Sequence, residues 1–275
     1  MTTLQALRSR GGKLFLIPLS SLMCLAASPL SPQAGKDLVA AACYNARHQL
    51  EDQSLWSSRI QRRSGGHVYL EKEIETVDGT VHRLISVDGH EPSPSERKQD
   101  DDRLQDLAQR PKARLALKKD HEADERRLSD LLRVIPEAFL FEDQGNRGGA
   151  EKIAFRPNPA YKPKTYEERA LHAMNGTILI DLQEQRLVQL SASLTQQVNF
   201  GYGAIARLNQ GGTISINRIR VAPGIWKTSS SRVNIDGRLV LFKTISKQQD
   251  EVHSDFTSVA PDTSIAQALQ QLGGK

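Results

Sequence analysis

The sequence predicts an α+β fold in which helices cover one face of a single antiparallel sheet. Short segments of alternating apolar and polar residues follow one another from residue 176 to 245, with tight turns and no helical segment between them. This order is typical of an antiparallel meander and not of parallel βαβ units. Between residues 95 and 135, highly charged segments with helical periodicity interrupt the strand pattern. Because every second position of the strands is apolar, one face of the sheet requires a cover, and these helices are the candidates.

The first 27 residues have the composition of a secretory signal peptide. Arg8, Arg10 and Lys13 precede an apolar run at 14–25, and small residues follow at 26–28. We therefore expect an exported, periplasmic protein, and no later segment reaches the roughly 18 apolar residues of a membrane helix. Removal of the signal lowers the formal charge from +5 to about +2, which is too small an excess to indicate nucleic-acid binding.

The two cysteines leave a second possibility for the N-terminus. Cys24 lies in the apolar run, and Cys43 lies in the next predicted helix. Cleavage beyond Cys24 would leave Cys43 without a disulfide partner. Alternatively, Cys24 is a lipidated N-terminus that anchors the protein to a membrane, although a lipoprotein signal has a small residue where Met23 stands.

Periodicity places the other elements within a single domain at residues 28–257. A helix is expected from Ala34 to Leu50. An Asp-Gly pair at 78–79 predicts a hairpin turn, and a similar pair at 236–237 predicts another. Residues 258–275 are polar, and we expect a mobile tail. The expected strands are 67–76, 81–87, 139–141, 152–155, 176–181, 186–192, 198–202, 213–221, 225–228, 231–235 and 239–245.

The charged insertion predicts two helices, or one helix kinked at Pro111. Charges of both signs crowd the segment from Glu96 to Arg133, which favours solvent-exposed helices over an acidic or basic binding arm. Such helices would dock on the sheet through a narrow apolar edge. That edge consists of Leu128, Leu131, Leu132 and Ile135, which follow helical spacing.

Catalytic and metal-binding motifs are not apparent in the sequence. The serine-hydrolase elbow Gly-x-Ser-x-Gly does not occur, and Glu125 stands where a zinc protease would have a second histidine after His121. Gly201–Ala206 fits a dinucleotide-binding loop, but the chain leaves no room for its helix, so we interpret it as a bend in a strand. His67 and His82 lie in one predicted hairpin, and a zinc site there would need further ligands. We therefore predict no enzyme, cofactor or metal site, and an exported hydrolase is the least favoured alternative.

Several stretches resemble a known family in both type and order. They are Phe155-Arg-Pro157 followed by a loop with Tyr166, then 176–181 with 186–190, and a late strand at 239–244. Together with the signal and the N-terminal helix, this order resembles the half-barrels of bacterial lipoprotein localisation (the LolA/LolB-like fold). The resemblance covers most of the chain after the signal. It implies a highly curved antiparallel sheet whose concave face is covered by helices, with a cavity that shelters acyl chains of lipoproteins or other lipids.

The candidate ligand contacts are apolar residues of the strands and of the helical edge. Val198, Phe200 and Tyr202 share one face by the two-residue period of a strand. We expect a non-enzymatic envelope protein that binds an apolar ligand between sheet and helices. The alternatives are that these residues are ordinary core and that the protein is a structural or protein-interaction component of the envelope. The full set of candidates is Phe139, Phe155, Val198, Phe200, Tyr202, Leu128, Leu131 and Ile135.

Overall fold

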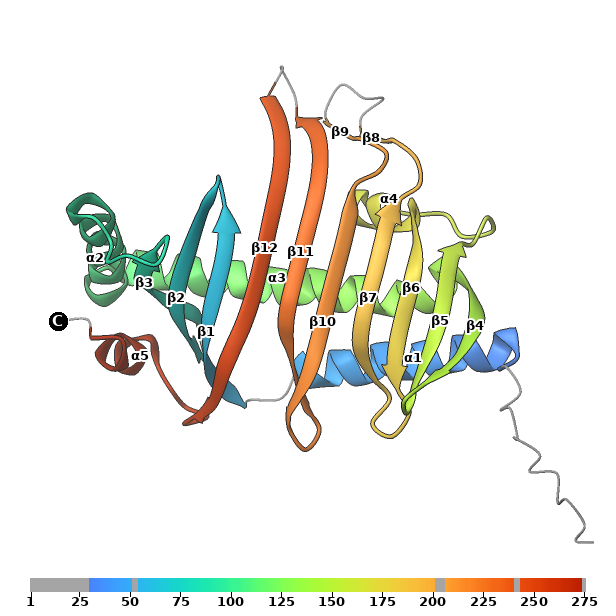
Figure 1. Ribbon diagram of the computed structural model, residues 1–275, viewed down its shortest axis with the longest axis horizontal. Helices are drawn as coiled ribbons and strands as arrows, with labels where there is room; N and C mark the ends of the chain where they lie inside the picture. The colour runs from blue at the N-terminus through green and yellow to red at the C-terminus, as the bar shows by residue number, and fades with distance from the viewer. Residues whose placement is uncertain (1–29, 51–53, 201–205, 240–242, 274–275) are drawn as a thin grey trace, which may run out of the picture.

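The computed structural model describes residues 30–50, 54–200, 206–239 and 243–273. Within these residues the protein is α+β, with five helices and one sheet of twelve strands (Figure 1). The helices are α1 (Pro32–Leu50), α2 (Pro94–Gln109), α3 (Pro111–Ala138), α4 (Tyr166–His172) and α5 (Ile265–Gln271). The strands are β1 (Leu55–Ser64), β2 (His67–Thr76), β3 (Gly79–Val87), β4 (Phe139–Arg147), β5 (Ala150–Pro157), β6 (Met174–Asp181), β7 (Arg186–Leu194), β8 (Val198–Phe200), β9 (Ala206–Leu208), β10 (Thr213–Ala222), β11 (Ile225–Leu239) and β12 (Lys243–Val259).

The sheet is antiparallel at every strand pair of the described residues, as the sequence predicts. Its main order is β3-β2-β1-β12-β11-β10-β7-β6-β5-β4, and the short strands β8 and β9 join it at β11. The pairing of β1 with β12 joins the first and the last of the described strands in the middle of the sheet. The sheet is not closed, because β3 and β4 form its two ends within the described residues.

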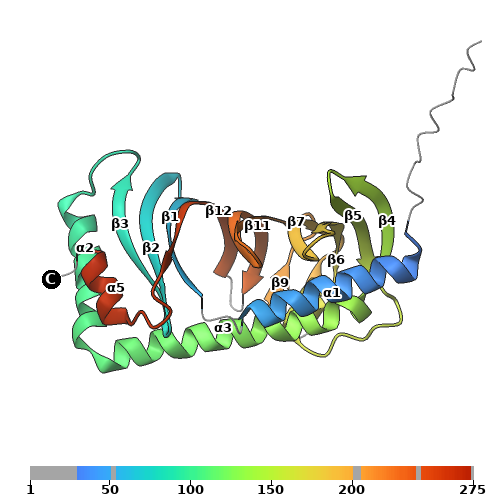
Figure 2. The same cartoon turned by 90° about the horizontal axis from the view of Figure 1, so that it is seen from below.

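Helices α1 and α3 lie side by side on one side of the sheet (Figure 2). The long helix α3 reaches from β3 at one end of the sheet to β4 at the other. Helix α1 contacts β4, β6 and β7, so it covers only one half of the sheet. The charged insertion forms two helices, and Pro111 at the start of α3 separates them as predicted. A capping box between Ser93 and Glu96 fixes the beginning of α2.

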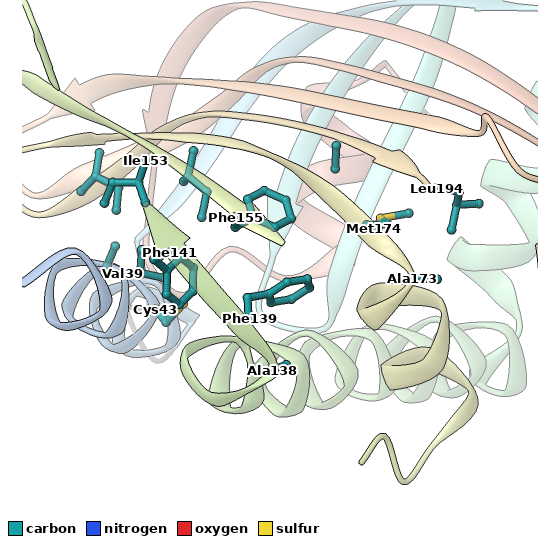
Figure 3. Close-up of a cluster of buried hydrophobic side chains, with 14 of the residues drawn as sticks. Val39, Cys43, Ala138, Phe139, Phe141, Ile153, Phe155, Ala173, Met174 and Leu194 are labelled. Carbon is teal, nitrogen blue, oxygen red and sulfur yellow. The ribbon is translucent and has the colours of Figure 1, made fainter. Parts of the chain in front are cut away.

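The largest apolar core, which we call the apolar cluster, lies between α1 and strands β4–β8 (Figure 3). Its strand residues alternate with more exposed ones, since successive side chains of a strand point to opposite faces. Helix α1 contributes four apolar side chains to this core, at positions 38, 39, 42 and 43. The buried members are Leu38, Val39, Ala42, Cys43, Ala138, Phe139, Phe141, Ile153, Phe155, Ala173, Met174, Ile178, Ile180, Ala192, Leu194, Val198 and Phe200.

The two Asp-Gly pairs for which we predict hairpin turns behave differently. The pair at 78–79 turns the chain between β2 and β3, as predicted, and Gly79 has a φ of +122°. The turn predicted at 236–237 is wrong, because β11 runs without interruption from Ile225 to Leu239. Gly237 pairs with β9 on one side and β12 on the other. A Cβ atom there would lie 2.3 Å from the carbonyl oxygen of Arg207, so this glycine permits close strand approach and not a turn.

The C-terminal segment forms a docked helix and differs from the mobile polar tail expected from the sequence. Residues up to Val259 continue β12, and α5 begins with a capping box between Ser264 and Gln267. Its apolar residues are buried against α2, β2 and β3, and they follow helical spacing that is easily overlooked among glutamines. These residues are Ile265, Ala268, Leu269 and Leu272, packed with Ile74, Val81, Leu104 and Leu107.

Candidate functional site

A cavity of about 510 Å³ lies between α3, the end of α1 and the middle of the sheet. It occupies the part of the helix-covered side that the apolar cluster does not fill. We call it the α3 cavity. Its lining consists of Ala46, Gln49, Ser54, Leu55, Glu73, Glu75, Thr76, Thr80, His121, Glu125, Leu128, Leu132, Leu187, Ile216, Arg218, Trp226, Lys227, Thr228, His253 and Phe256.

Apolar side chains from both layers form part of this lining. Leu128 and Leu132 face the cavity from α3, and Leu187, Ile216 and Trp226 face it from the sheet. Leu128 is 46% exposed, although it lies on the apolar edge of the helix. An apolar side chain that lines a cavity and keeps this exposure has unfilled contact surface, which is a favourable site for a hydrocarbon ligand.

An ion pair between β2 and β11 crosses the wall of the cavity. The Nζ atom of Lys227 lies 2.8 Å and 2.7 Å from the two carboxylate oxygens of Glu75. The backbone N–H of Trp56 donates to the same carboxylate at 3.0 Å. Burial nevertheless raises the pKa of Glu75 above its usual value, and the attraction of Lys227 only partly opposes that effect. Lys227 therefore stabilises a negative charge on Glu75 in buried surroundings that favour the protonated carboxyl group.

Histidines and carboxylates continue this polar lining toward β3 and β12. None of these histidine–glutamate pairs includes a nucleophile that its partner could activate as a base. Among the described residues, no three histidine, cysteine, aspartate or glutamate side chains are grouped as a metal site requires. The pairs are His82 Nδ1 with Glu73 at 3.6 Å, His121 Nε2 with Glu125 at 3.4 Å, and His253 Nε2 with Glu251 at 3.9 Å.

Arg218 on β10 is a half-buried cation of the cavity lining. Its Nη2 atom donates to the carbonyl oxygen of Trp226 and lies 3.4 Å from Oε1 of Gln49. Burial and, to a smaller extent, the positive charge of Arg186 together lower the pKa of Arg218 to about 10. No carboxylate among the described residues lies within ion-pair distance of this guanidinium.

The residues predicted as ligand contacts fall into different environments. Leu128 lines the α3 cavity, while Ile135 packs against the apolar cluster. Leu131 is half-buried on α3 and belongs to neither the cavity lining nor the cluster. Phe139 and Phe155 lie in the cluster and also line a second hollow of about 540 Å³ near the start of α1.

Phe200 does not line the α3 cavity, although we expected it in the wall of a cavity between sheet and helices. Val198 and Phe200 are buried in the apolar cluster, and the ring of Tyr166 packs edge-on against Phe200 at 5.3 Å. Tyr202 lies outside the described residues. The residues that do surround the α3 cavity, such as Trp226, Lys227 and Glu75, come from strands far apart in the sequence. Of these three residues, only Trp226 carries a signal in the sequence, as a large aromatic within the expected strand 225–228.

Comparison with known protein families finds no matching family model, and comparison with curated proteins finds no significant match. Within the part of the chain that the structure describes, none of the helices is both long enough and apolar enough to cross a membrane. The functional argument therefore depends on the geometry of the α3 cavity.

Proposed function

We propose that this is a non-enzymatic protein of the cell envelope that binds the apolar chain of a lipid or lipoprotein in the α3 cavity. The observation that carries the proposal is this cavity of about 510 Å³, bounded by apolar side chains of α3 and of the sheet. Its size falls within the range of about 300–1,000 Å³ that is typical of small-molecule sites. Each methylene group moved from water into such a site contributes about 0.8 kcal/mol, so several together give useful affinity.

The arrangement of the layers supports the same proposal. An open antiparallel sheet with α1 and α3 on one side is compatible with a curved half-barrel whose hollow is covered by helices. The signal-like N-terminal sequence supports a periplasmic location for this activity.

The test compares two leucines of the same helix. Leu128 is 46% exposed and lines the cavity, whereas Leu115 is 52% exposed and does not. We expect Leu128→Asp to weaken binding of a fluorescent fatty acid at least tenfold, because a carboxylate would enter the apolar wall. Leu115→Asp should bind the probe like the unmodified protein. Both variants should secrete and fold, since neither leucine is buried.

Native mass spectrometry of the protein from its own envelope provides the complementary measurement. Co-purified lipid of a defined mass would support the proposal. A stoichiometric protein partner with no lipid would instead support an interaction component of the envelope. Equal probe binding by Leu128→Asp and Leu115→Asp would show that the α3 cavity is not the binding site.

A further inference from the structure

Among the described residues that line the α3 cavity, the charged side chains other than Arg218 lie beside an ionic or histidine partner. Lys227 pairs with Glu75, and the histidines of the lining each lie near a glutamate. Arg218 lacks such a partner among the described residues, and the nearest charge that affects its pKa is the like charge of Arg186. A buried cation without a counter-ion is costly unless another group compensates it.

The carboxylate of Glu184, which contacts the lining residue Trp226, already has two partners. One carboxylate oxygen of Glu184 accepts from the indole N–H of Trp226 at 2.6 Å, and the other lies 2.9 Å from Nε of Arg220. Glu184 is thereby held by Trp226 and Arg220, and it forms no ion pair with Arg218.

The guanidinium of Arg218 also has unused hydrogen-bonding capacity. Both of its contacts, to the Trp226 carbonyl and to Gln49, use Nη2. Within the described residues, no hydrogen bond from Nε or Nη1 to a protein atom is formed. These two nitrogens are part of the planar fork with which arginine binds carboxylates and phosphates in a bidentate manner.

We infer that the α3 cavity takes an amphiphile whose anionic group pairs with Arg218 while its hydrocarbon chain lies against Leu128, Leu132 and Ile216. This inference rests on the proposed function and specifies its ligand. The shared chemistry is a carboxylate or phosphate joined to an unbranched apolar chain. The carboxylates of Glu73, Glu75 and Glu125 belong to the same lining, but each has a cationic or histidine partner.

The alternative is a purely structural arginine. In that case Arg218 serves only to hold the Trp226 carbonyl and the Gln49 side chain, and water in the cavity solvates the rest of its charge. The two roles differ in one measurable respect. A structural arginine would not distinguish a charged amphiphile from an uncharged one of the same length.

The experiment is isothermal titration calorimetry with four probes below their micellar concentrations. Dodecanoate and dodecyl phosphate carry the anion on a chain, dodecanol has the chain without the charge, and inorganic phosphate has the charge without the chain. We expect dodecanoate and dodecyl phosphate to bind at least about tenfold more tightly than dodecanol, as a charged hydrogen bond provides. Inorganic phosphate should not bind measurably.

The variants Arg218→Gln and Arg218→Lys identify the group responsible. Arg218→Gln should remove the preference for the anionic probes and leave dodecanol binding unchanged, and Arg218→Lys should restore part of the preference. The control is Arg232→Gln, because Arg232 is an exposed arginine that pairs with Asp250 at 2.9 Å and does not line this cavity. That control should behave like the unmodified protein.

The outcomes separate this inference from the proposed function. Equal binding of dodecanoate and dodecanol by the unmodified protein would overturn the inference and leave the proposed function intact. A uniform loss of all probes in Arg218→Gln would also overturn it, since the residue would then be structural. Failure of every chain-bearing probe to bind the unmodified protein would overturn the proposed function itself. If Arg218→Gln does not fold, the comparison of probes on the unmodified protein still decides.

Discussion

The apolar cluster and the α3 cavity lie on the same side of one sheet, yet their interiors differ completely. In the apolar cluster, residues such as Ile153 and Ile180 are fully buried and leave no accessible surface. In the cavity, Leu128 is nearly half exposed, and charged residues alternate with apolar ones. Protein interiors are normally packed to the density of organic crystals. The packed interior of the apolar cluster is therefore the part that supplies stability, although a second hollow adjoins this cluster near the start of α1.

The composition of the facing elements explains this difference. Helix α1 presents apolar residues such as Val39 and Ala42, which are buried against β4, β6 and β7. Opposite α3, strand β2 contributes Glu73 and Glu75, whose charges cannot be buried without partners. Ile74, which alternates with them along the strand, packs with α2 and α5 instead. Strand β2 thus places Ile74 in the core beside α2 and α5, and it places Glu73 and Glu75 in the lining of the α3 cavity.

The largest expected effect distinguishes a packed leucine from a cavity leucine. Leu194 in the apolar cluster is 2% exposed, so Leu194→Ala should lower the free energy of unfolding by about 2–5 kcal/mol. Leu128→Ala removes the same atoms from the cavity wall, and it should cost less than about 1 kcal/mol because few contacts are lost. Urea unfolding of both variants measures the difference. Equal costs would mean that the α3 cavity is packed in solution, which would remove the basis of the comparison.

Local signals in the sequence were sufficient for much of the fold. Asp78-Gly79 predicted the first hairpin because the turn chemistry is contained in two residues. Helix α1 and the break at Pro111 followed from periodicity and from the missing N–H of proline. The sequence was misleading at Asp236-Gly237, where the close approach of β9 and not a turn requires a glycine. That approach is a tertiary property, and no local pattern contains it.

The candidate site was predictable only in part. The apolar edge of α3 was visible as a helical stripe, and Leu128 and Leu132 do line the cavity. Phe200 was expected in the same wall, but it is core. The ion pair of Glu75 with Lys227 joins residues 152 positions apart. Its formation depends on strand order across β1 and β12, which the sequence did not reveal.

A second, smaller effect should come from the ion pair in the cavity wall. Lys227→Met leaves Glu75 without its cation, and we expect a loss of about 1–3 kcal/mol at pH 7.5, as for other poorly compensated polar groups. The loss should be smaller at pH 4.5. Unfolding free energies of the variant and of the unmodified protein at both pH values test this expectation.

The sign of this pH dependence follows from the pKa of Glu75. Burial raises that pKa in the folded state, so the fold favours the protonated carboxyl group. The contribution of Glu75 to stability is therefore greatest at low pH and is lost as the pH rises through the folded-state pKa. Without Lys227 the pKa should rise further, which makes the loss larger. In the double variant Glu75→Gln/Lys227→Met, the extra pH dependence should disappear, and its persistence would assign the effect to other groups.

The smallest expected effect concerns Cys43, which lies in α1 against the apolar cluster and is 8% exposed. Burial raises the pKa of its thiol to about 12, although Arg47 partly opposes the shift. The thiol therefore acts as an apolar packing group, and Cys43→Ala should cost less than about 1 kcal/mol, since one atom is removed.

In protein lacking Cys24, a thiol reagent at pH 8 should label Cys43 only when α1 opens. Leu194→Ala should accelerate this labelling because it loosens the cluster under α1, whereas Lys227→Met should leave the rate nearly unchanged. Equal acceleration by both variants would show that the packed region and the cavity open together, as one cooperative unit and not as two separate regions.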